Sequence, residues 1–212
     1  MKGLGTALVT PFLEDGSVDF EALGTLIEHQ VAGGTDYLVV LGTTSESPTL
    51  THKEQDEIID FVVKQVAGRM PLVLGVGGNS TAAVVARIEE LKATLTANFA
   101  AILSVTPYYN RPQQEGLYLH FCEVANASPV PVILYNVPKR TGVNLLPETT
   151  RRIYDACPDK IMGIKEACNS VEQFAQTVEV SQGDFAVISG DDDLAYDMMK
   201  VGGDGLISVA SN

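Results

Sequence analysis

One lysine ends an apolar run in which a charged side chain is unusual. The run reads Ile161-Met162-Gly163-Ile164-Lys165-Glu166. If it is a β-strand, alternation places Ile161, Gly163 and Lys165 on one face. Burial disfavours the charged form of an amine, and the free amine can attack a carbonyl carbon. For a lysine taken alone, the more common alternative is a surface residue paired with Glu166.

A tyrosine interrupts the preceding apolar run in a similar way. Tyr135 lies in Val132-Ile133-Leu134-Tyr135-Asn136 and shares its parity with Ile133. A hydroxyl on that face could donate and accept protons if a neighbour lowered its pKa from about 10. The alternative is a packed tyrosine with a satisfied hydroxyl, and for this residue alone that alternative is favoured.

Other polar residues follow apolar runs and could hold an anionic substrate. Residues 42–46 read Gly-Thr-Thr-Ser-Glu, a glycine followed by hydroxyls that suits a carboxylate, or else a turn leading into the next helix. Arg140 could bind a carboxylate through two parallel hydrogen bonds. The adjacent Tyr108 and Tyr109 suggest an interface with another chain.

The remaining acidic, histidine and cysteine residues give weaker signals. Asp191-Asp192-Asp193 could hold a cation, but an acidic start to the next helix is the better explanation. The three histidines lack metal-ligand spacing, and we expect them on helix surfaces: His29, His52 and His120. Three scattered cysteines predict neither a disulfide framework nor a zinc site, and they fit a reducing cytoplasm: Cys122, Cys157 and Cys168.

These residues belong to a regular alternation of short apolar runs and helical patterns. The runs are apolar on both faces, as in parallel strands that are covered by helices. We expect eight strands: Thr6–Thr10, Tyr37–Leu41, Leu72–Gly75, Ala101–Thr106, Val132–Asn136, Ile161–Lys165, Phe185–Ser189 and Gly205–Ser208.

Seven helices are expected between the strands. The first carries Phe20, Leu23, Ile27 and Val31 on one face, with Asp19 as its N-cap. The second opens on a capping box, Thr51-His52-Lys53-Glu54, ahead of an apolar stripe from Ile58 to Val66. The other five are expected near Thr81–Lys92, Glu115–Ala127, Pro147–Tyr154, Val171–Val180 and Leu194–Val201.

Two architectures fit this pattern, a closed (β/α)₈ barrel and an open doubly wound sheet. An open sheet that binds a dinucleotide carries GxGxxG at its first turn, where this chain has Thr10-Pro11-Phe12. The glycines of 75–78 come after the third strand and are better explained as a tight loop. Eight evenly spaced units favour the barrel, whose active sites lie at the carboxyl ends of the strands.

The length of the chain sets a limit on that barrel. The sequence has 212 residues, whereas a complete barrel typically needs about 250. We expect one α/β barrel domain over 1–212, truncated after the eighth strand, without the eighth helix.

The charge of the chain excludes some classes of partner. With 14 basic and 27 acidic residues, the formal net charge is −13, which disfavours nucleic acid and anionic membrane surfaces. No apolar run approaches the roughly 20 residues of a membrane span.

Five segments together resemble the dihydrodipicolinate synthase family, in the superfamily of pyruvate-dependent class I aldolases that also includes N-acetylneuraminate lyase. They occur in the family's order and spacing: GTTSE at 42–46, VTPYYNRP at 105–112, LYNVPKRTG at 134–142, GIKEA at 163–167 and SGDDD at 189–193. The resemblance spans the whole chain and implies a (β/α)₈ fold followed by a C-terminal helical segment that this chain lacks.

The resemblance also implies roles for individual residues. Lys165 would form a Schiff base with pyruvate, and Tyr135 would donate and accept protons. Thr43 would relay protons between Tyr135 and Tyr109, which would enter from a neighbouring subunit. Four further residues would bind substrate or line the pocket: Thr44 for the pyruvate carboxylate, Arg140 for the second substrate's carboxylate, Gly190, and the carbonyl of Ile207.

The implied reaction condenses pyruvate with L-aspartate-4-semialdehyde to 4-hydroxy-tetrahydrodipicolinate, in the diaminopimelate route to lysine, in a homotetramer built from dimers. No metal or organic cofactor is implied, because the iminium is the electron sink. Two alternatives remain: a related aldolase or lyase with another second substrate, and a truncated barrel that binds ligand without turnover.

Overall fold

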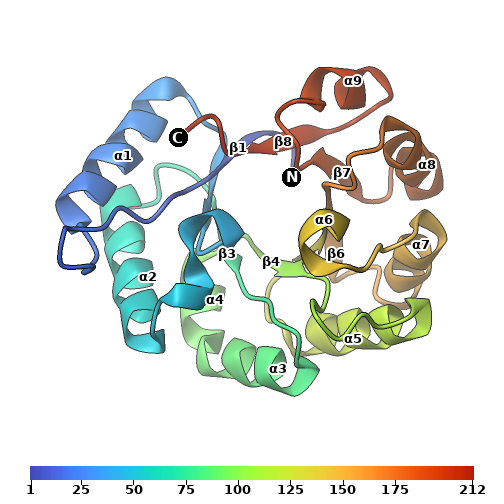
Figure 1. Cartoon of the computed structure of the whole chain (residues 1–212), viewed down its shortest axis with the longest axis horizontal. Helices are drawn as coiled ribbons and strands as arrows, with labels where there is room; N and C mark the ends of the chain where they lie inside the picture. Colours follow the sequence, from blue (N-terminus) through green and yellow to red (C-terminus); the bar gives the residue numbers. More distant parts are fainter.

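The structure, a computed structural model that describes residues 1–212, is a closed barrel of eight parallel strands (Figure 1). Each strand pairs with its neighbours in chain order, and β1 closes the barrel against β8. The predicted (β/α)₈ barrel is therefore confirmed. The strands are β1 (Gly3–Ala7), β2 (Tyr37–Val40), β3 (Leu72–Gly75), β4 (Ala101–Val105), β5 (Val132–Asn136), β6 (Ile161–Glu166), β7 (Ala186–Ser189) and β8 (Gly205–Ser208).

Helices surround the strands on the outside of the barrel (Figure 1). Both chain ends lie between α1 and α9, where β1 and β8 meet, and no helix follows β8. None of the helices has the length and apolar composition that crossing a bilayer requires. The helices are α1 (Phe20–Gly33), α2 (His52–Val66), α3 (Thr81–Glu90), α4 (Lys92–Asn98), α5 (Gln114–Ala127), α6 (Pro138–Thr141), α7 (Pro147–Ala156), α8 (Val171–Ser181) and α9 (Ala195–Lys200), with 3₁₀ turns η1 (Thr43–Ser45) and η2 (Ser47–Thr49).

The predicted helix starts are confirmed at α1 and α2. The Asp19 carboxylate accepts the amide of Ala22 at 2.9 Å. At α2 the Thr51 hydroxyl accepts the Glu54 amide, and the Glu54 carboxylate accepts the Thr51 amide at 2.8 Å. Each cap satisfies amide donors that the first turn of a helix leaves unpaired.

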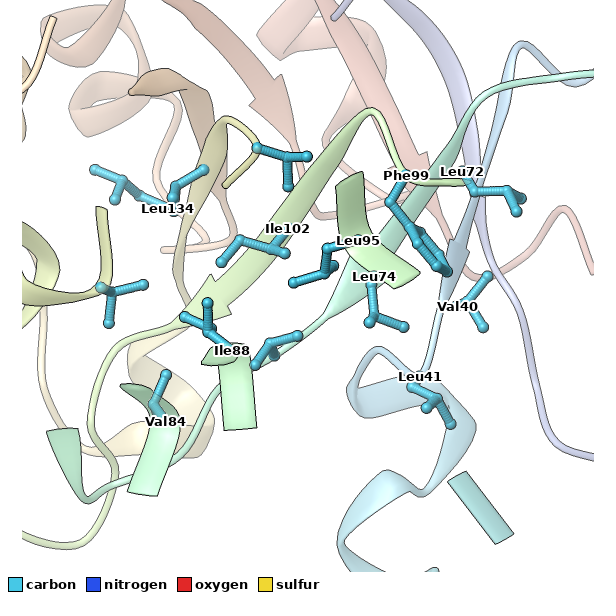
Figure 2. Packing of buried hydrophobic residues seen from close by; sticks show 14 of the residues in the cluster. Val40, Leu41, Leu72, Leu74, Val84, Ile88, Leu95, Phe99, Ile102 and Leu134 are labelled. Atoms are coloured by element: carbon cyan, nitrogen blue, oxygen red, sulfur yellow. The ribbon is translucent and has the colours of Figure 1, made fainter. Parts of the chain in front are cut away.

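Two apolar layers stabilise the barrel. The larger lies between the strands and the helices, and Figure 2 shows part of it, with Ile88 and Leu95 from α3 and α4 beside Leu74 and Ile102 from β3 and β4. The smaller layer fills the barrel interior and includes Tyr135. Along the strands, except for an irregularity in β6, alternate residues belong to different layers, which is why the strands are apolar on both faces.

The strand prediction was wrong at β1, which runs over Gly3–Ala7 rather than Thr6–Thr10. In the barrel Gly3 pairs with Gly205, and Gly5 leaves room for the Tyr37 ring, which a side chain there would overlap. Pairing with β8 therefore decides the limits of the strand, over a weak local propensity.

The helix prediction was incomplete between β3 and β6. The helix expected over Thr81–Lys92 is two helices, because α3 ends at Glu90 and α4 continues from Lys92 to Asn98. The short α6 after β5 was not predicted, since four residues carry no periodic pattern. His120, expected on a surface, is buried, and its Nδ1 lies 2.8 Å from the Thr81 hydroxyl.

The alternation in β6 also departs from the prediction. The pairing of β5 with β6 shifts by one residue after Val132, so Ile161 lies in the outer layer whereas Met162 packs against the inner one. Beyond this irregularity Ile164 faces the outer layer and Lys165 pairs with Tyr135. The predicted inward direction of Lys165 holds, but Ile161 does not share its face.

Two leucines on α5 provide a test of the outer layer. Leu117 is 0% exposed and Leu119 is 55% exposed. Leu117→Ala removes buried methyl groups and leaves a cavity, so we expect it to lower the free energy of unfolding by about 2–5 kcal/mol. The matched Leu119→Ala should change it by about 0.5 kcal/mol or less. Urea unfolding followed by circular dichroism measures both, and equal effects would contradict the layer assignment.

Candidate active site

Lys165 and Tyr135 are neighbours at the carboxyl end of the barrel. They pair in register across β5 and β6, and both are buried, with Lys165 3% exposed. The Lys165 Nζ lies 4.4 Å from the centroid of the Tyr135 ring, a geometry in which a cation is attracted to the ring face. The structure therefore brings together an amine and a phenol that the sequence separates by 30 positions.

The environment of Lys165 favours the free amine. The pKa of Lys165 is lowered to about 8, chiefly by burial and also by the Arg140 charge, and the carboxylate of Asp192 acts in the opposite direction. An ordinary lysine titrates near 10.4 and is almost wholly protonated at neutral pH. A pKa near 8 leaves a useful fraction of nucleophilic amine at pH 7 to 8.

Gly190, which follows β7, makes room for the Lys165 side chain. A Cβ at position 190 would lie 2.8 Å from Lys165 Cε and 3.0 Å from its Cγ, closer than real side chains approach. The Gly190 amide donates to the Glu166 carbonyl at 2.8 Å, which fixes the close approach. Any larger residue at 190 would have to displace the lysine stem.

Tyr135 lies beside Thr43 and within reach of the charge of Arg140. Burial raises the pKa of Tyr135, whereas the Thr43 hydroxyl and the Arg140 guanidinium act to lower it. Thr43 and Tyr135 line one cavity of about 340 Å³, to which Tyr108 also contributes. Lys165 is not among the residues that line this cavity, so Tyr135 lies between the cavity and the lysine.

The turn after β2 supplies the other hydroxyls of this region. Thr43, Thr44 and Ser45 form η1, in which the Ser45 hydroxyl and amide both donate to the Gly42 carbonyl, at 2.7 and 3.1 Å. The Thr10 hydroxyl, after β1, donates to the Ser45 carbonyl at 2.8 Å. The turn is thus held from within and from β1, and Thr44 is partly exposed on it.

The remaining predicted residues fall into two groups. Arg140 is exposed on α6, yet its charge acts on both Lys165 and Tyr135, and Ile207 is buried in the barrel on β8. Tyr109 is different, because it is 88% exposed and has a left-handed φ of 69°. None of Arg140, Ile207 and Tyr109 lines the cavity bordered by Thr43 and Tyr135.

Two charged groups near the site were not recognised as such in the sequence. The Asp192 carboxylate acts on Lys165 and accepts the amides of Val209 and Ala210, at 2.9 and 3.1 Å. Burial alone would raise the pKa of Asp192, but the Ser208 hydroxyl and these amides hold it below its usual range. The acidic triplet at 191–193 was the available signal, and it was assigned to a helix terminus.

Glu166 is the second unrecognised group. It is fully buried and its side chain points to the outer layer, away from Lys165, so it is not a surface partner of that lysine. The pKa of Glu166 is raised to about 7, because burial outweighs the opposing effect of donors from Asn136, Cys168 and Gln173. The sequence shows a charged residue after the lysine, but the face to which its side chain points depends on the register of β6.

Comparisons with known proteins agree with this geometry. The model of the dihydrodipicolinate synthetase family matches residues 1–212. A 4-hydroxy-tetrahydrodipicolinate synthase of Parabacteroides distasonis is 52% identical over 212 residues, which are 100% of this chain and 70% of that protein. The relative from Flavobacterium psychrophilum with the same name is 51% identical over 98% of this chain and 69% of its own length.

Solved structures give the same result. Dihydrodipicolinate synthase from Aquifex aeolicus has a TM-score of 0.92 and 43% identity, over 99% of this chain and 70% of that one. A monomeric variant of dihydrodipicolinate synthase has a TM-score of 0.94 and 40% identity, over 100% of this chain and 70% of the variant. The match extends over the whole chain in both sequence and fold, and the chain therefore belongs to the dihydrodipicolinate synthetase family.

Proposed function

We propose that this protein condenses pyruvate with L-aspartate-4-semialdehyde through a Schiff base on Lys165, giving 4-hydroxy-tetrahydrodipicolinate for the diaminopimelate route to lysine. The observation that carries the proposal is the buried Lys165 amine, with a pKa near 8, against the ring of Tyr135. The name shared by the curated relatives supports the choice of substrates.

The chemistry follows from the amine. The Lys165 nitrogen adds to the keto carbon of pyruvate, the carbonyl oxygen leaves as water, and an iminium remains. The positive nitrogen acidifies the pyruvate methyl group, which loses a proton to give an enamine. The enamine carbon then attacks the aldehyde carbon, and the amino group of the second substrate displaces Lys165 as the ring closes.

Tyr135 is the proposed acid and base for these proton transfers. Tyr135 and Thr43 border the same cavity, and the side chain of Thr43 is a hydrogen-bond partner of the phenol. Burial leaves the pKa of Tyr135 above its ordinary value, so the proposal rests on the position of the phenol beside Lys165 and Thr43, from which it can exchange protons. Thr43 is the proposed next member of the relay.

The two substrate carboxylates have separate proposed sites. Thr44 and the backbone of η1 bind the carboxylate of pyruvate, and Gly190 and the Ile207 carbonyl line the space beside Lys165. Arg140 binds the carboxylate of the aldehyde, where a guanidinium can form two parallel hydrogen bonds. A local cation matters on a chain of net charge −13, which otherwise repels both anions.

The alternatives are less well supported. A different aldolase would keep Lys165 and Tyr135 but would not need Arg140 for an aldehyde carboxylate, and the relatives carry the synthase name. A barrel that only binds ligand would have no use for an amine with a lowered pKa. The cytoplasm is the proposed location, and it rests on the pattern of the cysteines.

The proposed assembly is a homotetramer built from dimers. Tyr109 is 88% exposed, and Tyr108 beside it lines the cavity, so a second chain placed here could bring its Tyr109 to Thr43. Large exposed aromatics of this kind are enriched at interfaces. One solved relative is described as a monomeric variant.

Trapping with borohydride tests the Schiff base. Reduction in the presence of pyruvate should add a stable pyruvyl group to Lys165, located by mass spectrometry of peptides. Because only the free amine reacts, the initial rate of trapping should rise with pH through about 8 and then level off. Lys165→Arg is the control and should gain no group. Modification of another lysine, or a midpoint near that of an ordinary lysine, would contradict the proposal.

Removal of one hydroxyl tests the proton transfer. Tyr135→Phe should lower turnover by about 10²- to 10⁴-fold, the usual loss of a general acid and base, and leave the circular dichroism spectrum unchanged. Tyr37→Phe is the matched control, because Tyr37 is also buried in the barrel interior but its hydroxyl has no hydrogen-bond partner. That variant should retain turnover, and equal losses in the two variants would argue against a specific role of Tyr135.

Mixing tests the relay between subunits. Tyr109→Phe should be nearly inactive alone, and so should Tyr135→Phe. Dissociated and reassembled together, the two variants should regain activity, because some sites then combine an intact Tyr135 with an intact Tyr109 from the other chain. Sedimentation at the assay concentration gives the assembly. A fully active monomer would exclude the relay.

A further inference from the structure

We propose that Glu166 is a positioning residue, which fixes the orientation of the Asn136 side-chain amide and thereby holds the segment that carries Arg140. This inference rests on the proposed function, because it takes Arg140 as the group that binds the aldehyde's carboxylate. Nothing in the motif resemblance gives Glu166 or Asn136 a role.

Glu166 lies in the outer layer among neutral donors. Its Oε1 accepts the Asn136 side-chain amide at 2.8 Å, and its Oε2 accepts the Gln173 side-chain amide from α8 at 3.3 Å. The thiol and backbone amide of Cys168 also face it. A buried carboxylate is costly unless it is hydrogen-bonded, so a chain that keeps one here obtains a fixed arrangement of its donors.

The Asn136 side chain holds together the two ends of the loop formed by residues 137–143. It ends β5, and its Oδ1 accepts the Leu145 amide at 2.9 Å. Its Nδ2 donates to Asn144 Oδ1 at 2.8 Å and lies 3.2 Å from the Leu145 carbonyl. Residues 137–143, which include α6 and Arg140, form the loop between these ends. One side chain therefore connects the start of this loop to its end.

The orientation of the Asn136 amide decides whether the two ends of the loop stay hydrogen-bonded to each other. A flipped amide would place Nδ2 against the Leu145 amide and Oδ1 against oxygens of Asn144 and Glu166, losing every contact. Both carboxyl oxygens of Glu166 accept side-chain amides, Oε1 that of Asn136 and Oε2 that of Gln173, so Glu166 selects the orientation that leaves Asn136 Oδ1 for Leu145. Glu166 thus acts on Arg140 through Asn136, without touching substrate.

A second pair of hydrogen bonds, between Asn144 and Gln173, holds the end of the same loop. The Asn144 Nδ2 donates to Gln173 Oε1 at 2.8 Å, and the Gln173 Nε2 donates back to Asn144 Oδ1 at 3.1 Å. Gln173 thereby connects the loop to α8 as well as to Glu166. Because each member is hydrogen-bonded, removing one leaves other buried polar groups without partners.

Lys165 does not depend on this network, although it is adjacent to Glu166. The β6 backbone is held by main-chain bonds, from Ala167 N to Asn136 O and from Gly190 N to Glu166 O, both 2.8 Å. The Lys165 side chain points to the opposite face. Loss of the Glu166 carboxylate should therefore disturb Arg140 and spare Lys165, a split that a general loss of stability would not produce.

Glu166→Gln tests the proposal. Glutamine offers one acceptor and one donor group, so its amide must face a donor of Asn136 or of Gln173. We expect the KM for aspartate-4-semialdehyde to rise about tenfold, since a small displacement of a binding group has a large effect. The KM for pyruvate and the rate of borohydride trapping should stay within about twofold of the original. Glu172→Gln, at an exposed position of α8, is the matched control and should change none of these values.

Asn144→Ala provides a second test that keeps the buried carboxylate, in case the first variant does not fold. Asn144 is partly exposed, and its loss should raise the KM for the aldehyde in the same direction by a smaller factor. A rise for both substrates alike, or an unchanged aldehyde KM in both variants, would overturn the role of Glu166. Arg140→Ala separates the two proposals: an unchanged aldehyde KM there would overturn the assignment of Arg140 itself.

Discussion

An amine inside a barrel loses the water that stabilises its charge, and this cost organises the site. Burial is the largest influence on the pKa of Lys165, which lies near 8, and it thereby favours the free, nucleophilic amine. The Asp192 carboxylate limits the shift, and the amides after β8 hold that carboxylate in place. The proposed chemistry thus depends on closure of the barrel, which removes water from one lysine and leaves one anion within range of it.

Much of this arrangement could be predicted from the sequence, because the pattern of a parallel barrel repeats. Apolar runs indicated all eight strands, and Lys165 and Tyr135 were noticed because polar residues interrupted them. Properties set by strand pairing could not be predicted. The limits of β1 depend on β8, the shift in β6 moves Ile161 to the outer layer, and burial of His120 depends on packing between α3 and α5.

Glu166 shows the same limit within the site. From the sequence it was a possible surface partner of Lys165, yet adjacent residues on a strand point to opposite faces. One face of β6 therefore carries the proposed nucleophile into the barrel interior, and the other carries a carboxylate into the layer beneath the helices. A shift of one residue in the pairing of β5 and β6 would exchange them, so the irregularity near Ile161 decides which of the two side chains enters the barrel.

The two proposed substrate contacts are held by different kinds of structure. Lys165 is on a strand whose backbone is fixed on both sides, by β5 and by β7. Arg140 is on a four-residue helix within a loop, and side-chain hydrogen bonds hold the two ends of that loop together. In a barrel, a rigid strand suits a side chain whose position must not vary, while a loop segment can change without disturbing the core. Pyruvate activation and recognition of the second substrate can then vary separately. Asn136 connects the two, because it ends β5 beside the strand of Lys165 and its side chain holds the loop of Arg140.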